Sequence, residues 1–217
     1  MPHDHPEHDH QHLSPSGHPY RPDNDTPLTY WQTMEIALRE LLIEKGVTTA
    51  AEIARQIDAM DAHSPADGAR VVARAWVDRE FRARLLADAS EASREMGFDI
   101  GALRLIAVEN TENVHNVIVC TLCSCYPRNL LGMAPDWYKS RAYRSRVVRE
   151  PRRVLLEFGL DLAEDVTVRV HDSTADMRYI VLPARPAGTE DLDEGALAAL
   201  VTRDSMIGTG VAKTPDL

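Results

Sequence analysis

The chain contains little sulfur, few aromatic rings and few positive charges. Only three of its 217 residues are cysteine, aromatic residues make up 6%, and 34 acidic side chains outnumber 24 basic ones. The formal charge of −10 argues against a nucleic-acid partner, because phosphate binding depends on clustered Lys and Arg. No apolar run is long enough to cross a bilayer and no signal peptide is visible, so we expect a cytoplasmic protein with no membrane partner.

The scarce cysteines are concentrated at one place, as Cys120, Cys123 and Cys125. A disulfide framework is a poor explanation, because three is an odd number and no distant cysteine exists for a loop to close onto. The thiolate is a metal ligand and a redox-active group, so a metal site is the first hypothesis. Structural zinc and the usual iron–sulfur clusters need four protein ligands, and the fourth would have to be a histidine such as His115, on a predicted strand.

The Cys-x-x-Cys-x-Cys spacing suggests a different geometry. Its last two thiols flank a single residue, so the chain must wrap tightly around whatever they hold, and the backbone amides of Ser124 and Cys125 come close to the same centre. If deprotonated, these amides add two nitrogen ligands to three sulfurs and leave one position open. Amide nitrogen binds only strongly Lewis-acidic ions, which favours a trivalent metal, and an open position is a catalytic arrangement. A hypothesis of another class is a non-catalytic metal-binding or redox-sensing module whose cysteines oxidise reversibly.

Residues 1–27 have the composition of a solvated, disordered tail, with almost no apolar residue to bury. Weak capture of a divalent metal for delivery to the cysteines is the functional alternative, since imidazole binds such ions. The histidines that alternate here with Asp, Pro and Gln are His3, His5, His8, His10, His12 and His18.

Residues 28–97 have helical patterns and helix-start signals. Thr29 and Gln32 form a capping box, and the pattern that follows ends at Gly46. Further helices are predicted to begin at Thr49, at Ser64–Pro65 and at Asp78, the last of them running on toward Gly97. The first helix carries an apolar stripe that is either core or an interface. We expect 28–97 to be an arm that contacts a partner subunit, because so long an arm has little of its own domain to pack on. The stripe consists of Met34, Leu38, Leu41 and Leu42.

Residues 98–217 mix strands with helices. We expect strands at 103–108 and 114–119, a clearly alternating strand at 166–170, and a strand at 179–182 that pairs with it. Helices are expected from 135, at 151–158 and, as the last one, at 193–201. The predicted fold class is therefore α+β, with an N-terminal helical arm followed by a layered α/β catalytic domain.

The run Cys-Thr-Leu-Cys-Ser-Cys-Tyr-Pro at 120–127 resembles the metal claw of the nitrile hydratase α-subunit family, which includes the γ subunit of thiocyanate hydrolase. We call Cys120–Cys125 the claw. The resemblance covers about residues 30–210 and implies a nitrile hydratase alpha-like fold in a hetero-oligomer with a β-type subunit. Its other matching segments, in the order of the chain, are 71–76, 143–152, 185–189 and 200–208.

The resemblance also implies the ligands of one metal ion per chain. The sulfurs of Cys120, Cys123 and Cys125 and the amides of Ser124 and Cys125 would bind it, with Cys123 oxidised to sulfinate and Cys125 to sulfenate. Thr121 favours non-corrin cobalt(III) over iron(III), because cobalt members resemble Cys-Thr-Leu-Cys and iron members Cys-Ser-Leu-Cys. A metal-loading activator protein is a further possible partner.

The implied activity is that of a cobalt nitrile hydratase, which converts a nitrile and water to an amide. The metal acts as a Lewis acid, and either the Cys125 sulfenate oxygen or an activated hydroxide attacks the nitrile carbon; we favour the sulfenate. Ser124 would orient the claw. In this family the arginines that clamp the oxidised sulfurs come from the β subunit. The arginines at 144–153 of this chain are mostly explained by a solvated helix face or a salt-bridge network.

Two departures from typical cobalt members concern the substrate. Arg128 stands where they have Trp, and Ile100–Arg104 replaces a segment that carries a pocket glutamine. Both changes resemble thiocyanate hydrolase γ subunits and three-subunit nitrile hydratases acting on nucleoside nitriles. Arg128 would steer anionic thiocyanate, hydrogen-bond a polar nitrile or pair with a partner. Tyr126 is either a packing aromatic or a pocket wall. Thiocyanate hydrolase, forming carbonyl sulfide and ammonia, is therefore the alternative function.

Overall fold

The computed structural model describes residues 27–123 and 125–215, and the chain divides into two compact units, 1–53 and 54–217. The expectations for the histidine-rich tail concern residues almost all of which lie outside the described ranges, as does Ser124. The roles predicted for them therefore stay predictions. Each unit is described by itself.

The described part of the first unit consists mainly of helix α1 (Tyr30–Glu44). Its predicted capping box is confirmed, since the Thr29 amide donates to Gln32 Oε1 at 2.8 Å and the Gln32 amide donates to Thr29 Oγ1 at 3.3 Å. Gly46 ends the helical turn with a φ of +66°, which glycine adopts without steric cost. None of the residues of α1 is buried. Helix α2 (Ala50–Asp61) starts at the predicted Thr49–Glu52 box and continues into the second unit.

The second unit begins with helices α3 (Pro65–Val77), α4 (Arg79–Ala87) and α5 (Ala89–Glu95). Helix α3 comes so close to its neighbours that a Cβ on Gly68 would lie 2.6 Å from Leu131 Cδ2. Helices α4 and α5 both pack on strand β1 (Arg104–Glu109). The compact unit starts at Ala54 and includes α3 to α5, which bury their apolar faces within it, so it begins before the catalytic domain proposed from residue 98.

The predicted fourth helix is two helices in the structure. Asp88 takes an extended conformation and accepts hydrogen bonds from the amides of Ser90 and Glu91, so it ends α4 and begins α5. Helix α10 (Glu194–Leu200) was expected to be the last helix. A further helix, α11 (Arg203–Ile207), follows it, and Thr202 is its N-cap. Such short helices lack the periodic apolar pattern that makes longer ones predictable.

The strands form two parallel pairs: β1 with β4 (Met177–Leu182), and β2 (Val114–Val119) with β3 (Thr167–Asp172). The strand expected at 179–182 was predicted to pair with the one at 166–170, and this is wrong. The short connection after β3 carries the chain to the other sheet, and an alternating pattern does not encode a strand's partner.

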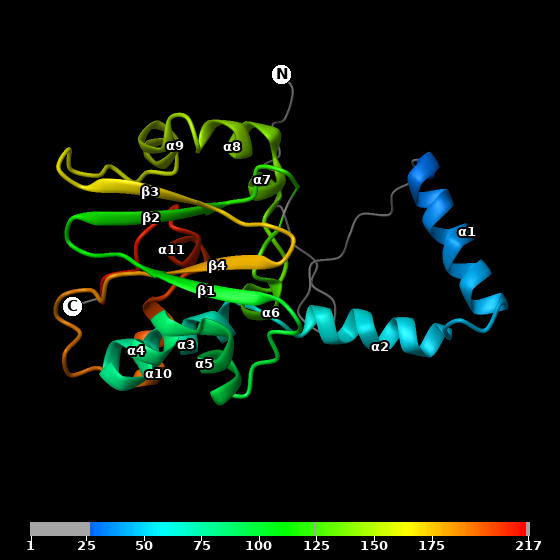
Figure 1. Ribbon diagram of the computed structural model, residues 1–217, viewed down its shortest axis with the longest axis horizontal. Helices are drawn as coiled ribbons and strands as arrows, with labels where there is room; N and C mark the ends of the chain where they lie inside the picture. Colours follow the sequence, from blue (N-terminus) through cyan, green and yellow to red (C-terminus); the bar gives the residue numbers. More distant parts are fainter. Residues whose placement is uncertain (1–26, 124, 216–217) are drawn as a thin grey trace, which may run out of the picture. The chain divides into compact units, whose positions relative to one another are not determined.

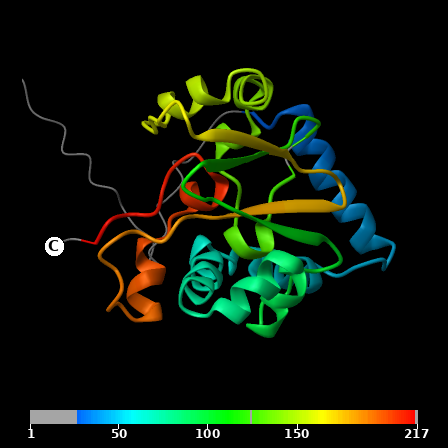
Figure 2. The same cartoon turned by 60° about the vertical axis from the view of Figure 1, so that its left-hand side comes forward.

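The layers follow one another from top to bottom in Figure 1, and the turned view in Figure 2 agrees. Helices α8 (Arg141–Arg146) and α9 (Pro151–Glu157) come first, then β3 and β2, then β4 and β1, and last the helices α3, α4, α5 and α10. The centre is apolar, since Val117, Ile118 and Val119 of β2 have no exposed surface. The predicted layered α+β class is confirmed.

In the described part of the chain, no helix is both long and apolar enough to span a membrane. Two short helices complete the fold: α6 (Arg128–Leu131), which was not predicted, and α7 (Asp136–Lys139), at the place where the sequence predicted a helix to begin.

Candidate metal centre

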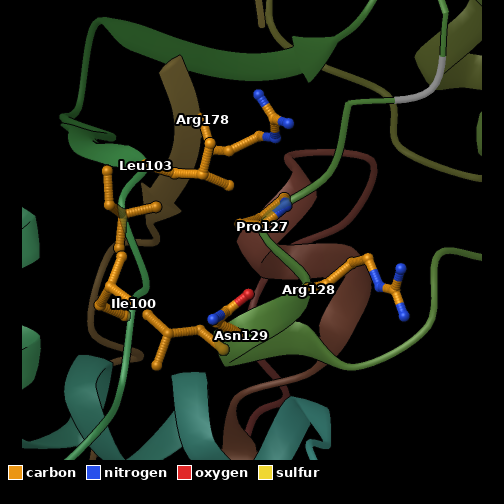
Figure 3. Close-up of a pocket in the computed structure, with 8 residues that line it drawn as sticks. Ile100, Leu103, Pro127, Arg128, Asn129 and Arg178 are labelled. Atoms are coloured by element: carbon orange, nitrogen blue, oxygen red, sulfur yellow. The ribbon is translucent and has the colours of Figure 1, made fainter. Parts of the chain in front are cut away.

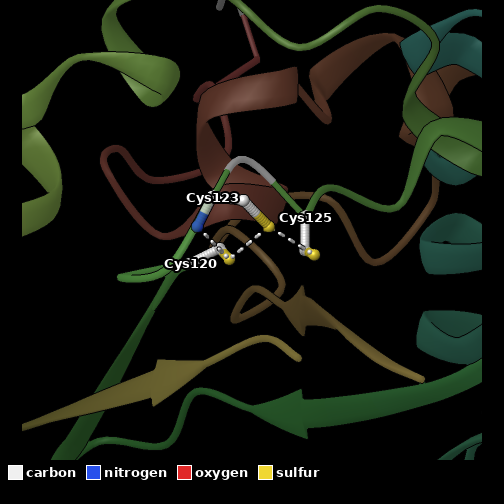
Figure 4. A group of neighbouring side chains, drawn as sticks. All are labelled: Cys120, Cys123 and Cys125. Carbon is white, nitrogen blue, oxygen red and sulfur yellow. Dashed lines mark hydrogen bonds between the residues drawn. The ribbon is translucent and has the colours of Figure 1, made fainter. Parts of the chain in front are cut away.

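The three cysteine sulfurs converge where β2 ends. Cys120 follows Val119 directly and is buried, whereas Cys125 is half-buried and Cys123 exposed. The Cys123 sulfur lies 3.5 Å from that of Cys120 and 3.1 Å from that of Cys125 (Figure 4). All three sulfurs lie within 4.8 Å of one another. The sequence prediction that these residues form one cluster is confirmed.

The separations between the sulfurs can be compared with those expected when sulfurs bind the same metal ion. Sulfurs about 2.3 Å from a metal lie roughly 3.3 Å apart when they subtend a right angle, and roughly 3.8 Å apart at the tetrahedral angle. The separations of 3.1 and 3.5 Å are of the size found between sulfurs that share one metal ion. The three cysteines therefore fit a single metal ion as sulfur donors.

The alternative of a fourth ligand from His115 is not supported. His115 lies on β2, but its Nε2 is 2.8 Å from the carbonyl oxygen of Gly208 and its Nδ1 is 3.3 Å from Asn110 Nδ2. Both ring nitrogens are engaged away from the claw. Among the described residues, the group of close metal-ligating side chains contains the three cysteines alone.

The first peptide group of the claw is held from the neighbouring strand. Val119 and Asp172 are opposite each other in the β2–β3 register, so the Asp172 carboxylate lies beside the start of the claw. The amide of Thr121 donates to Asp172 Oδ1 at 2.9 Å, and the Thr121 hydroxyl donates to Oδ2 at 2.6 Å. Thr121 therefore has a structural role next to the metal ligands, and Asp172 is a site residue that the sequence did not reveal.

Two further side chains hold carbonyl groups of the claw. The Tyr138 hydroxyl, from α7, donates to the carbonyl oxygen of Cys125 at 2.9 Å. Arg144, from α8, donates to that of Cys123 at 2.6 Å. The expected salt-bridge network is confirmed for Arg146, which binds Glu150 and Glu157, but not for Arg144.

Burial governs the electrostatics of the site. It raises the pKa of the Cys125 thiol to about 12; hydrogen bonds with the other two sulfurs add to this, and the positive charge of Arg178 opposes it. Without a metal, this thiol keeps its proton at neutral pH, so metal binding must displace the proton. Burial also raises the pKa of the Tyr126 and Tyr138 hydroxyls above the usual value, so that both stay neutral and Tyr138 remains a donor to the claw.

Tyr126 and Arg128 both line one pocket of about 550 Å³, immediately after the claw in sequence. The pocket also receives Arg178 and, from α2, Met60, whose sulfur lies 3.3 Å from a guanidinium nitrogen of Arg128. Within the described residues, no carboxylate forms an ion pair with either arginine. The remaining lining residues are Gln56, Ala59, His63, Asp99, Leu103 and Asn129.

A smaller apolar recess of about 10 Å³ adjoins this pocket (Figure 3). Ile100 and Leu103 form part of its wall. A second large hollow, about 590 Å³, is lined by Thr121 and Leu122 of the claw and by residues of α8 and the turn after it. The claw thus has a hollow at each of its two ends. The residues that complete the second hollow are Arg141, Arg144, Ser145, Val148 and Arg149.

Residues 29–210 match the family described as nitrile hydratase, alpha chain. The chain is 51% identical over 182 residues to a nitrile hydratase subunit alpha of Rhodococcus sp, covering 82% of this chain and 92% of that one. It is 50% identical to the cobalt-containing nitrile hydratase subunit alpha of Pseudonocardia thermophila, with coverages of 82% and 88%. It is also 43% identical to the thiocyanate hydrolase subunit gamma of Thiobacillus thioparus, with coverages of 84% and 80%.

Solved structures agree with the fold. A recombinant thiocyanate hydrolase with partially modified cobalt centres superposes with a TM-score of 0.82 at 41% identity, covering 86% of this chain and 92% of that one. A double mutant of the Fe-type nitrile hydratase from Comamonas testosteroni gives a TM-score of 0.81 at 44% identity, with coverages of 88% and 94%.

Proposed function

Because the chain belongs to the nitrile hydratase alpha-chain family, we propose that it is the catalytic α-type subunit of a cobalt nitrile hydratase, which hydrates nitriles to amides. The observation that carries this proposal is the convergence of the Cys120, Cys123 and Cys125 sulfurs at distances that suit one shared metal ion. A redox-sensing module without turnover would need no substrate pocket, whereas here a pocket of about 550 Å³ adjoins the residue that follows Cys125.

The proposed metal is one non-corrin cobalt(III) ion per chain, held by the three sulfurs and by the amide nitrogens of Ser124 and Cys125. Bound there, it would supply Lewis acidity toward the nitrile. Relatives described as cobalt-containing and the presence of Thr121 favour cobalt, although an Fe-type enzyme has a similar fold. The Thr121 hydroxyl donates its hydrogen bond to Asp172, so Thr121 would act by fixing the conformation of the claw.

In the proposed reaction, Cys125 carries the nucleophilic oxygen as a sulfenate and Cys123 is a sulfinate. The oxygen on Cys125 attacks the nitrile carbon; water then attacks the Cys125 sulfur, the original sulfur–oxygen bond breaks and the amide leaves with that oxygen. The oxygen of water restores the sulfenate, and its two protons end on the amide nitrogen. Tyr138 contributes by holding the Cys125 carbonyl, which keeps this ligand's backbone in place. An activated hydroxide is the other candidate nucleophile. Ser124 is proposed to orient the claw through its hydroxyl.

A β-type subunit is the proposed partner, in a hetero-oligomer. Helix α1 has an exposed apolar row in which Leu38 is 56% exposed, with Trp31, 78% exposed, at the start of the helix, and large exposed apolar surfaces mark interfaces. The partner would also bring the arginines that clamp the oxidised sulfurs. A metal-loading activator protein is a second proposed partner, and the histidine-rich tail is proposed to capture metal for it.

Thiocyanate hydrolase is the second candidate function, because Arg128 and Arg178 both line the pocket and form no ion pair with a carboxylate of the described residues. Two guanidinium groups favour an anion such as thiocyanate, which would yield carbonyl sulfide and ammonia. The 43% identity to a thiocyanate hydrolase γ subunit agrees with this candidate.

An activity screen of the full complex on aliphatic nitriles, nucleoside nitriles and thiocyanate separates the two functions. Arg128→Trp sharpens the screen, since it replaces the pocket cation by the residue of typical cobalt nitrile hydratases. Amide formation by the unmodified complex supports the first function, and thiocyanate turnover that is lost in Arg128→Trp supports the second.

Elemental analysis and peptide mass spectrometry of the active complex test the metal centre itself. We expect about one cobalt per chain, with Cys123 two oxygens and Cys125 one oxygen heavier than the free thiol. Active enzyme containing zinc and unmodified thiols contradicts the oxidised claw.

A further inference from the structure

Arg144 differs from Arg146, two residues further along the same helix, in the group that its guanidinium contacts. The Arg146 guanidinium forms ion pairs with Glu150 and Glu157, but Arg144 forms none with a carboxylate of the described residues. Its Nη1 instead donates to the carbonyl oxygen of Cys123 at 2.6 Å. A hydrogen bond of this length from a cationic donor is among the stronger ones found in proteins.

The position of Arg144 is fixed by a short helix. The Ser140 side chain caps α8 by accepting from the Tyr143 amide at 3.1 Å, and the Tyr143 hydroxyl donates to Ile118 of β2 at 2.7 Å. The helix is thereby tied to the strand that leads into the claw. Arg144 is half-buried, so its charge is less screened than that of a fully exposed arginine.

The carbonyl that accepts from Arg144 belongs to the peptide group whose nitrogen is that of Ser124. In the proposed function this nitrogen is a metal ligand without its proton. The negative charge of such a peptide group is shared between its nitrogen and its oxygen. A guanidinium on the oxygen therefore lies where charge accumulates as the metal is bound, and it is oriented before this happens.

We infer that Arg144 is a positioning residue for the metal: it holds the Cys123–Ser124 peptide and compensates the charge that this peptide carries in the metal-bound claw. The inference rests on the proposed function. Asp172 and Tyr138 hold neighbouring peptide groups, but Asp172 accepts hydrogen bonds and Tyr138 is a neutral donor. Among the described residues, Arg144 is thus the cationic contact to the claw backbone. The partner's arginines would act on sulfur-bound oxygens instead.

The chain offers matched controls for this role. Arg141 and Arg149 line the same hollow as Arg144, yet the side chain of neither forms a hydrogen bond or an ion pair within the part of the chain that the structure describes. Removing either charge changes the potential of the hollow and leaves the claw backbone contact intact. Arg141→Met is the closer control, because Arg141 lies on the same helix as Arg144.

The experiment compares Arg144→Met, Arg144→Gln and Arg144→Lys with Arg141→Met in the full complex. It measures cobalt per chain, the rate at which a chelator removes cobalt, and the sulfur-to-cobalt charge-transfer absorption band. We expect Arg144→Met to lose cobalt about 10- to 100-fold faster, the range typical of groups that support metal ligands, with a shifted band. Arg144→Gln, which keeps a donor without charge, should behave like Arg144→Met. Arg144→Lys should recover much of the loss, and Arg141→Met should match the unmodified complex.

Thermal unfolding of the metal-free chain separates charge compensation from packing. If Arg144→Met shows the unmodified rate of cobalt loss and band, the inference is overturned; it is equally overturned if Arg144→Gln matches the unmodified complex, because charge is then irrelevant. A lower melting temperature with an unshifted band assigns Arg144 a packing role and also overturns it. If the unmodified complex binds no cobalt, the proposed function fails first, and this outcome is distinct from the others. Should Arg144→Met not assemble, the Gln and Lys pair decides.

Discussion

The claw and helix α1 differ in how far this chain completes them. Side chains from β3, α7 and α8 each hold a backbone group of the claw, so its sulfurs converge without help from another molecule. Helix α1 has equally good local signals, with a full capping box, yet none of its residues is buried. The comparison shows that good helix-start signals determine a helix but not what covers it. This chain holds the claw backbone with its own side chains, whereas no residue of α1 is buried by the described part of the chain.

The largest expected effect is a loss of turnover when a cysteine of the claw is replaced. Cys125→Ser removes a soft metal ligand and the proposed nucleophile, so turnover should fall by about 1,000-fold or more. Turnover and cobalt content of the complex are the measurements, and size exclusion shows whether the variant still assembles. Near-normal kcat with cobalt bound would exclude the sulfenate role.

The next largest effect is expected when helix α1 is deleted. Deleting residues 1–45 removes the exposed apolar row, so we expect loss of the hetero-oligomer and of most activity, on the order of 100-fold. The unit from Ala54 onward has its own core and should still melt cooperatively. Deletion of residues 1–26 alone is the matched control, because it keeps α1. An active, monomeric product of the longer deletion contradicts an interface role for the helix.

A pair of glycines sharpens the comparison in terms of stability. Both have positive φ, but a Cβ on Gly208 would lie 2.0 Å from the Asn116 carbonyl oxygen, while one on Gly46, after α1, meets nothing within 4 Å. Gly208→Ala should lower the free energy of unfolding by about 3 kcal/mol or more, through strain and a clash with β2. Gly46→Ala should cost only about 1 to 2 kcal/mol, from backbone strain alone. Chemical denaturation of both variants checks the difference, and equal losses would contradict it.

A smaller effect is expected where β3 holds the claw. Asp172→Asn keeps one oxygen acceptor but loses the charge that receives both Thr121 hydrogen bonds. We expect a loss of about 1 to 2 kcal/mol in the unfolding free energy of the cobalt-bound complex. Asp176→Asn, in the turn beyond β3, is the control. No change in the Asp172 variant would show that the Thr121 amide finds another acceptor.

The smallest effect concerns pH. Burial lowers the pKa of His115 below its ordinary value of 6.5, and the hydrogen bond with the Gly208 carbonyl oxygen opposes this shift only in part. Below pH 6.5 the unfolded chain takes up this proton before the folded one does. Stability is therefore fully present above pH 6.5 and falls as the pH is lowered, by at most about 1.4 kcal/mol per pH unit for this group. Unfolding free energies at pH 7.5 and 5.5 should differ less in His115→Gln than in the unmodified chain, with His63→Gln as control.

The sequence predicted the features whose information is local. The cysteine cluster lies within one short run, the cap at Thr29 needs only Gln32, and β2 ends in the apolar run Val117–Val119; all three were found. What it did not predict depends on distant pairing. Asp172 meets Thr121 across 51 positions, and no pattern near either residue indicates the other.

Arg144 illustrates the same limit among charged residues. It stands in a run of arginines that resembles a solvated helix face, and for Arg146 an ion-pair network is what the structure contains. Only the packing of α8 beside β2 shows that Arg144 contacts the claw while Arg146 forms ion pairs. The partner of β4 was missed for a related reason, since strand propensity describes a strand's own faces and not its neighbour.

The β2–β3 register has a consequence for the order of events during folding. The first peptide group of the claw is held only after segments some fifty residues apart have paired, and such non-local pairings form late because loop closure must precede them. A ribosome-bound chain that has just emerged through Cys125 therefore has the thiols but not the strand that holds them. We therefore expect the proposed metal to enter after folding, and the proposed delivery protein to recognise a folded surface and not a nascent segment.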